Sequence, residues 1–328
     1  MEPSSSWAMS TASSERHPVS RSTRSAPALL AALLLSLTAC GGSSADEASS
    51  EASASDSGAF PVTVTGDNGE LTIESQPETI VSMSATATEM LYAIGAGDQI
   101  EAVDSTSNYP EGTPMTDLSA FTPNAEAIAE YAPDLVVLSD DINGIVDSLE
   151  ALEVPTLLLG AADTIDDSYT QLATLGDATG HPDEAAEVTA DMQDRIKEAV
   201  ASVPDDVAGM RVYHELDPTF YSATSATFIG SLYETFGLEN IADGSPEAAG
   251  GYPQLSAEYV VGQAPELIVL ADTVCCEQDA ETLAQRPAFD TVPAVAEGRI
   301  LEANDDIASR WGPRVADLAE QIAEVLQS

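Results

Sequence analysis

Short apolar stretches separated by polar turns divide the first half of the chain into alternating strands and helices. Residues 60–74 alternate apolar and polar positions around Asp67-Asn68-Gly69, which predicts a β-hairpin. Buried strands are predicted at 79–84, 99–104, 134–140 and 155–160, and helices at 85–97, 125–132 and 148–154. Because strands alternate with helices, the sheet is expected to be mostly parallel.

The second half repeats this alternation after one long helix. Val188, Met192, Ile196 and Val200 lie four positions apart within residues 181–204, which predicts an uninterrupted helix roughly 30 Å long. The following strands are predicted at 210–217, 266–272 and 298–304, and the helices at 227–241, 257–264 and 313–327. The long helix is expected to connect an N-terminal lobe, residues 60–180, to a C-terminal lobe, residues 205–328.

One sequence phrase occurs in both halves. "AEAIAEYAPDLVVLSD" at 125–140 matches "AEYVVGQAPELIVLAD" at 257–272, with eight of sixteen positions identical. A spacing of about 130 residues is the size of a small domain and is far longer than a solenoid repeat. The repeat predicts an equivalent helix–strand unit in each lobe, although helix–Pro–strand is also a common phrase in α/β proteins.

Residues 1–58 are not expected to belong to the folded body. Three arginines precede the apolar run "APALLAALLLSLTA" at 26–39, which has the length of a signal-peptide core, so residues 1–39 read as a signal peptide. The run ends at "LTAC", so Cys40 is expected to carry lipid after cleavage; the alternative is an ordinary signal peptide cleaved near Ala39. Residues 40–58 are rich in Gly, Ser, Ala and acid, which predicts a disordered tether.

The chain is strongly acidic, with 56 Asp and Glu residues against 10 Lys and Arg residues. Without residues 1–39, 54 acidic and 7 basic residues remain, which gives a net charge of −47. Nucleic acids and anionic membrane surfaces require basic patches, so neither is an expected partner. Such an excess of acid is typical of proteins that work in high salt, and salt adaptation is our hypothesis for it.

Four stretches resemble the ferric-siderophore and vitamin B12 (cobalamin) binding proteins of ABC importers. They are "TIVSMSATATEMLYAIGAGDQIEAVDSTSNYP", "PNAEAIAEYAPDLVVLS", "FIGSLYETFGLENI" and "GRILEANDDIASRWGPR", and the similarity covers nearly everything from Thr79 to the C-terminus. The resemblance implies a clamshell of two Rossmann-like α/β lobes with mostly parallel sheets, joined by one long helix, with the ligand between the lobes. It also implies one acidic residue per lobe that meets an arginine of the importer's membrane subunits, and Glu89 and Glu234 match that pattern.

Aromatic residues on loops are candidate ligand contacts. Tyr109 and Phe121 lie in one long turn-rich loop, and flat aromatic faces suit a macrocycle or catecholate rings. Packing within the loop is the alternative for both. Tyr221 and Tyr252 are weaker candidates of the same kind from the C-terminal lobe.

A few charged residues complete the predicted ligand site. Asp140 and Asp272 end the two repeat strands, where open α/β sheets place their ligand crevice. Arg310, Trp311 and Arg314 form the only dense basic spot, in which Arg suits an anionic group and Trp can stack on a ring. Charge pairing with nearby aspartates is an equally weighted alternative for these arginines.

The remaining metal-binding and thiol chemistry is sparse. His181 and His214 are far apart in sequence and form no metal motif, so a bare metal ion is not expected and iron would arrive already chelated. Cys275 and Cys276 are adjacent, and no third thiol is free if Cys40 carries lipid. In an oxidising compartment they are expected to form a vicinal disulfide, with two free thiols as the alternative.

Together these features predict an extracytoplasmic, membrane-anchored substrate-binding component of an ABC importer, acting as a monomer with a permease and an ATPase. The ligand is expected to be a ferric siderophore, with cobalamin or haem as alternatives. A tethered ligand sensor is a further alternative, which an adjacent kinase gene rather than a permease gene would favour. No serine-hydrolase, Walker or dinucleotide motif occurs in the chain, so neither an enzyme nor a resident cofactor is expected.

Overall fold

A computed structural model describes residues 60–245 and 249–328. The expected signal peptide at 1–39, lipidation site at Cys40 and tether at 40–58 lie outside the described residues. The first elements are strands β1 (Val62–Gly66) and β2 (Gly69–Ile73), which pair antiparallel as the predicted hairpin. Gly69 ends the two-residue turn with a φ of 109°, a backbone conformation that favours glycine.

The N-terminal lobe contains a four-stranded parallel sheet with the strand order β4-β3-β5-β6. Its strands are β3 (Ile80–Met83), β4 (Ile100–Val103), β5 (Leu135–Leu138) and β6 (Thr156–Leu158). All four residues of β3 and of β5 are buried, as expected for central strands of a parallel sheet that is covered on both faces.

The C-terminal lobe has the same topology. Its parallel strands, in the spatial order β8-β7-β9-β10, are β7 (Arg211–Glu215), β8 (Glu239–Asn240), β9 (Leu267–Leu270) and β10 (Ile300–Glu302). Counted within each lobe, both sheets run second, first, third, fourth. The repeated phrase forms the third strand of each lobe, and Ala132 and Ala264 both adopt a left-handed conformation just before its proline. The predicted equivalence of the two units is therefore confirmed.

The helices follow the predicted alternation, with four that were not predicted: α4 and the short helices α8, α9 and α10. The α-helices are α1 (Ala85–Ala93), α2 (Ala125–Ala129), α3 (Ile145–Ala151), α4 (Ile165–Thr179), α5 (Pro182–Ser202), α6 (Phe228–Thr235), α7 (Ala257–Gln263), α8 (Ala280–Ala284), α9 (Pro293–Glu297), α10 (Asp305–Ser309) and α11 (Val315–Leu326). Short 3-10 helices are η1 (Ala96–Gln99), η2 (Ile142–Gly144), η3 (Asp205–Val207), η4 (Ile241–Gly244), η5 (Ala249–Gly251) and η6 (Phe289–Thr291). The apolar pattern did not predict α4, whose start is instead marked by a capping box between Thr164 and Asp167.

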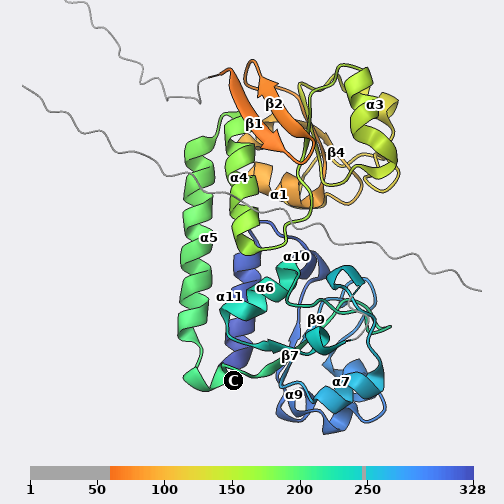
Figure 1. Ribbon diagram of the computed structural model, residues 1–328, viewed down its shortest axis with the longest axis vertical. Helices are drawn as coiled ribbons and strands as arrows, with labels where there is room; N and C mark the ends of the chain where they lie inside the picture. The colour runs from red at the N-terminus through yellow and green to blue at the C-terminus, as the bar shows by residue number, and fades with distance from the viewer. Residues whose placement is uncertain (1–59, 246–248) are drawn as a thin grey trace, which may run out of the picture. The chain divides into compact units, whose positions relative to one another are not determined.

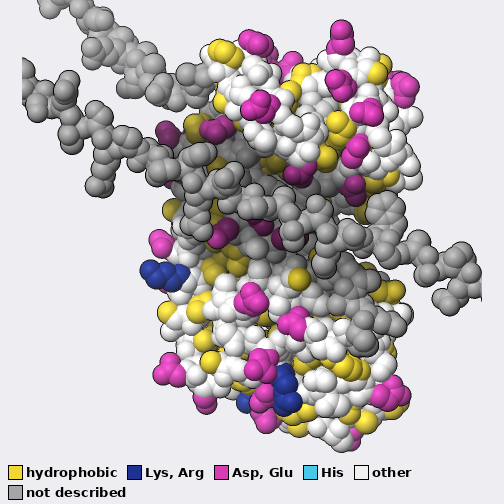
Figure 2. All heavy atoms as spheres, viewed as in Figure 1, with side chains coloured by type: hydrophobic (Ala, Val, Ile, Leu, Met, Phe, Trp, Pro, Cys, Tyr) yellow, Lys and Arg dark blue, Asp and Glu magenta, His cyan; other side chains and the backbone are white. Residues whose placement is uncertain are grey.

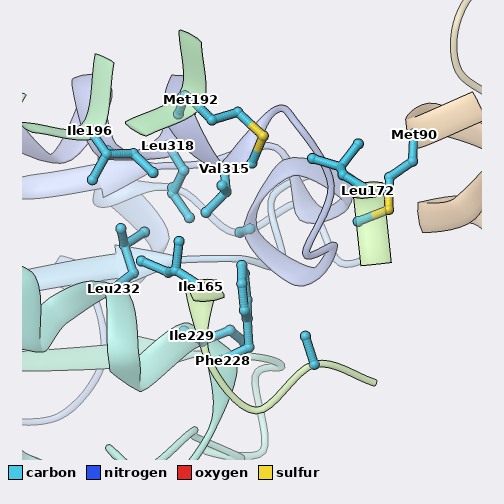
Figure 3. Packing of buried hydrophobic residues seen from close by; sticks show 14 of the residues in the cluster. Met90, Ile165, Leu172, Met192, Ile196, Phe228, Ile229, Leu232, Val315 and Leu318 are labelled. Atoms are coloured by element: carbon cyan, nitrogen blue, oxygen red, sulfur yellow. The ribbon is translucent and has the colours of Figure 1, made fainter. Parts of the chain in front are cut away.

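The long helix α5 packs against α4 of the N-terminal lobe and α11 of the C-terminal lobe, and in Figure 1 α4 lies along the upper part of α5 and α11 along its lower part. One cluster of buried apolar residues includes side chains from α1, α4, α5, α6 and α11. Figure 3 shows part of it, with Leu172 beside Met90 and with Val315 and Leu318 near Met192 and Ile196. The two lobes thus share a continuous core instead of meeting only through a linker.

The surface of the described residues fits the acidic composition. Figure 2 shows Asp and Glu side chains spread over the visible face, with Lys and Arg side chains at few places. Within residues 60–245 and 249–328, no helix combines the length and the apolar character needed to cross a membrane.

Candidate functional site

Exposed aromatic side chains gather on loops at the carboxyl ends of the parallel strands. Tyr109 and Phe121 follow β4 and are 44% and 71% exposed. Tyr221 follows β7 and Tyr252 follows β8, and they are 41% and 45% exposed. Partial burial and then the charge of Asp163, a residue of the N-terminal lobe, raise the pKa of the Tyr252 phenol. We call the loops that carry these four rings the aromatic loops.

A buried polar network holds the loop that carries Tyr109. Asp104 is fully buried at the end of β4 and accepts hydrogen bonds from Thr106 Oγ1 at 2.6 Å and from Ser107 Oγ at 2.5 Å. Thr88 Oγ1 in turn lies within hydrogen-bond distance of Ser82 Oγ at 2.8 Å and of Ser107 Oγ at 3.1 Å. Buried polar groups with satisfied hydrogen bonds specify one conformation, so this loop is preorganised.

Four charged side chains form what we call the interlobe ion cluster: Glu89, Asp306, Arg310 and Arg314. Glu89 in α1 is 3% exposed and accepts hydrogen bonds from Arg314 Nε at 2.8 Å, Arg314 Nη2 at 2.5 Å and Arg310 Nη1 at 2.8 Å. Arg310 also donates to Asp306 at 2.7 Å and to Asn108 at 2.9 Å. Two guanidinium groups balance two carboxylates, so the cluster is neutral and largely desolvated.

This cluster changes the roles expected of Arg310 and Trp311. Four hydrogen bonds within the protein occupy the guanidinium of Arg310, which leaves it poorly placed to hold an anionic ligand. Charge pairing, the alternative, is what the structure contains. Trp311 donates from Nε1 to Gln171 at 2.8 Å, and its partly buried ring packs against the shared core.

The docking role expected of Glu89 does not fit its position. A residue that meets another protein has to be exposed, whereas Glu89 is buried under two arginines. Glu234 lies in α6, is exposed, and remains a candidate. Both residues lie on the first helix after the first strand of their lobe, as expected, but they differ in burial.

Asp272 is a buried carboxyl and not the exposed ligand contact that the sequence predicted. It is 0% exposed beside Glu215, which is equally buried and accepts hydrogen bonds from Arg286 at 2.5 and 2.7 Å and from Tyr213 at 2.9 Å. Burial and then the charge of Glu215 raise the pKa of Asp272 to about 7. Both Asp272 oxygens lack a donor among the described residues. With its pKa raised by burial and a neighbouring carboxylate, Asp272 keeps its proton to a higher pH than an exposed carboxyl does. Asp140, by contrast, is exposed after β5.

A disulfide joins Cys275 and Cys276 in the loop after β9. Asp305, the first residue of α10, accepts hydrogen bonds from the backbone N–H groups of Val274 at 2.9 Å and Cys275 at 2.7 Å. Val274 is 66% exposed. The loop therefore presents an apolar knuckle at the same edge of the sheet as the aromatic loops of its lobe.

Metal-binding chemistry is sparse among the described residues. They contain no group of three or more side chains suited to hold a metal ion. His214 is fully buried with Nδ1 2.6 Å from the Tyr233 hydroxyl, and burial lowers its pKa to about 3, so it is neutral. A cavity between β2 and α3, lined by Asn68, Glu150 and Pro155 among others, has no aromatic wall and does not suit a conjugated ring.

Sequence reasoning missed several residues that shape the site. Asp104 and Glu215 end strands β4 and β7, and the rule that selected Asp140 and Asp272 would have found them if applied to every strand. Nothing in the local sequence marks Arg286, because its partner Glu215 lies 71 residues away.

The sequence and the fold are similar to those of known binding proteins. Residues 80–307 match the periplasmic binding protein family. The cobalamin-binding protein of Halobacterium salinarum is 30% identical over 93% of this chain and 85% of that protein. An uncharacterised ABC transporter substrate-binding lipoprotein of Bacillus subtilis is 26% identical over 90% of this chain and 94% of that protein. The periplasmic vitamin B12 binding protein of Vibrio cholerae shares the fold, with a TM-score of 0.63 and 22% identity over 76% of this chain and 96% of that one. The chain belongs to the periplasmic binding protein family.

Proposed function

We propose that this protein is the lipid-anchored, extracytoplasmic substrate-binding component of an ABC importer and binds one metal chelate between its lobes. The observation that carries the proposal is the set of four exposed aromatic rings on loops of both lobes. Rigid loops that present flat apolar faces suit a bulky conjugated ligand better than a small polar solute.

Among chelates, we rank cobalamin first. Carboxylates neutralise both arginines of the interlobe ion cluster, and the chain without residues 1–39 has 54 acidic and 7 basic residues. A highly anionic ferric catecholate is repelled by such a surface, whereas a corrinoid of low net charge is not. The cobalamin-binding relative from Halobacterium salinarum supports the same order. A ferric siderophore, which the sequence alone favoured, ranks second together with haem.

A titration tests the proposal directly. The folded body, residues 60–328, is titrated with cyanocobalamin, hemin and a panel of ferric siderophores, and binding is followed by calorimetry and by tyrosine fluorescence. We expect saturation at one ligand per chain for one of these chelates. Absence of binding to every member of the panel, in both low and molar salt, would reject the proposal.

The internal repeat contains a pair of acidic residues that are better candidates than Glu89 for docking on the permease. Glu126 and Glu258 occupy the same position of the repeated phrase, the second residue of α2 and of α7, and both are exposed. Among the described residues neither carboxylate takes part in an ion pair. One equivalent acid on each lobe is the arrangement that the family resemblance implies, so we propose Glu126 and Glu258 for this role.

Three variants separate the docking candidates. We expect Glu126→Ala with Glu258→Ala to bind ligand normally and to abolish transport by the reconstituted importer. Glu234→Ala tests the docking position inferred from the sequence. Glu130→Ala is the matched control, because Glu130 is another exposed acid and caps the carboxyl end of α2. Normal transport by the double variant would exclude this pair. Replacement of Cys40 by Ala should release the protein from the membrane fraction without changing ligand affinity.

A further inference from the structure

The ring of Tyr109 is covered on one side by a cation. The guanidinium carbon of Arg314 lies 4.1 Å from the centre of the Tyr109 ring, within the range of a close cation–π contact. The Tyr109 side chain nevertheless remains 44% exposed. One face of the ring is therefore backed by protein, and the rest of the ring is open.

Arg314 cannot move freely beneath this ring. Both oxygens of Glu89 bind its guanidinium, at 2.8 Å to Nε and 2.5 Å to Nη2, and Glu89 is itself buried. A two-point grip on a planar group fixes its orientation as well as its position. Arg314 is thus a rigid support supplied by the C-terminal lobe for a side chain of the N-terminal lobe.

The backbone that leads to Tyr109 is held as well. Asp104 binds Thr106 and Ser107 from within the N-terminal lobe. Arg310 binds the Thr106 carbonyl at 3.1 Å and the Asn108 side chain at 2.9 Å from the C-terminal lobe. The position of the Tyr109 ring is therefore determined by both lobes at once.

We propose that Arg314 is a positioning residue that holds Tyr109 as a preorganised stacking surface for a flat conjugated ligand of low net charge. This inference rests on the proposed function, that a chelate binds between the lobes. A ring that is already fixed loses little conformational freedom on binding, which increases affinity. Because Glu89 neutralises Arg314, the support adds rigidity without attracting anionic ligands.

A double-mutant cycle tests this role, with cyanocobalamin and hemin as probes. Arg314→Gln removes the cation but leaves Glu89 paired with Arg310, so the fold is retained. We expect roughly three- to thirtyfold weaker binding for Arg314→Gln in the wild-type background, and no further loss from Arg314→Gln when Tyr109→Ala is already present. Arg314→Lys, which keeps the charge and loses the two-point grip, should lie between. An equal loss from Arg314→Gln in the Tyr109 and Tyr109→Ala backgrounds would overturn the proposal.

The matched control is Arg195→Gln, which removes another two-point arginine–carboxylate pair, to Glu320, on the α5–α11 surface. It should leave probe affinity unchanged. The tyrosine ring signals in nuclear magnetic resonance spectra of the ligand-free protein supply a second test. The signal lost in Tyr109→Phe should shift in Arg314→Gln and not in Arg195→Gln, and an unshifted signal would refute the positioning role. This test holds even if the wild-type protein binds neither probe, an outcome that counts against cobalamin and haem as ligands.

Discussion

Glu89 and Arg314 lie 225 residues apart in the chain and form a two-point ion pair inside the protein. Glu89 belongs to the first helix of the N-terminal lobe and Arg314 directly precedes the last helix of the C-terminal lobe. The pair therefore fixes one lobe against the other beside the loop that carries Tyr109.

Removal of the central carboxylate should destabilise the protein strongly. Glu89→Ala leaves two largely buried guanidinium groups without their shared partner, which typically costs about 3–5 kcal/mol. Urea unfolding monitored by circular dichroism measures this difference. The exposed Glu234→Ala is the control and should change the free energy of unfolding by less than about 0.5 kcal/mol. Similar values for the two variants would show that the interlobe ion cluster contributes nothing to stability.

The buried carboxyl pair makes stability depend on pH. The raised pKa of Asp272, about 7 against an ordinary 3.8, means that the folded state keeps a proton that the unfolded state has lost. Stability is therefore lost as pH rises from about 4 to about 7, by about 2–4 kcal/mol. Asp272→Asn removes this term, so unfolding curves of wild type and variant should diverge with rising pH. Asp140→Asn is the control, because Asp140 is exposed, and its free energy of unfolding should depend on pH as that of the wild type does.

The shared core should restrict movement of the lobes. Side chains from both lobes pack into one cluster around α5, and opening the lobes would expose part of it. We expect nearly equal radii of gyration with and without ligand in small-angle X-ray scattering. Leu172→Ala, a fully buried residue of α4, should cost about 2–5 kcal/mol of stability. A clear decrease in radius on ligand binding would contradict the rigid arrangement.

Intact mass spectrometry tests the bond between Cys275 and Cys276. Alkylation of the denatured protein without reductant should add no alkyl group to residues 60–328, and two after reduction. The bond closes almost no loop, so its reduction should change the midpoint of unfolding very little. Two alkyl groups before reduction would show free thiols instead.

The acidic surface should make the fold depend on salt. With 54 acidic and 7 basic residues after residue 39, self-repulsion is strong in dilute buffer and is screened within a few ångströms in molar salt. We expect the thermal midpoint to fall as potassium chloride is reduced from molar to millimolar concentration. Sucrose at matched osmolality is the control, and an unchanged midpoint would reject salt adaptation.

The sequence by itself determined the alternation of strands and helices and the equivalence of the two lobes, although β8, α4 and the short helices α8, α9 and α10 were not predicted. Both follow from local patterns: β-strands alternate or are wholly apolar, long helices repeat every three to four residues, and the phrase at 125–140 recurs at 257–272. Local patterns also predicted the loop positions of four exposed aromatic residues, which follow predicted strands: Tyr109, Phe121, Tyr221 and Tyr252. Each of these patterns involves residues close together in the sequence, so it can be recognised without information about distant contacts.

Only the tertiary structure decided which charged residues are buried and with whom they pair. Glu89 lies on a helix like any exposed acid, and its burial arises from two arginines more than 220 residues away. Asp272 ends a strand as Asp140 does, yet one is enclosed beside Glu215 and the other faces solvent. Burial and charge pairing depend on which distant segments pack against a residue. Desolvation then determines whether a carboxylate stays exposed for a ligand, forms a buried ion pair or keeps its proton.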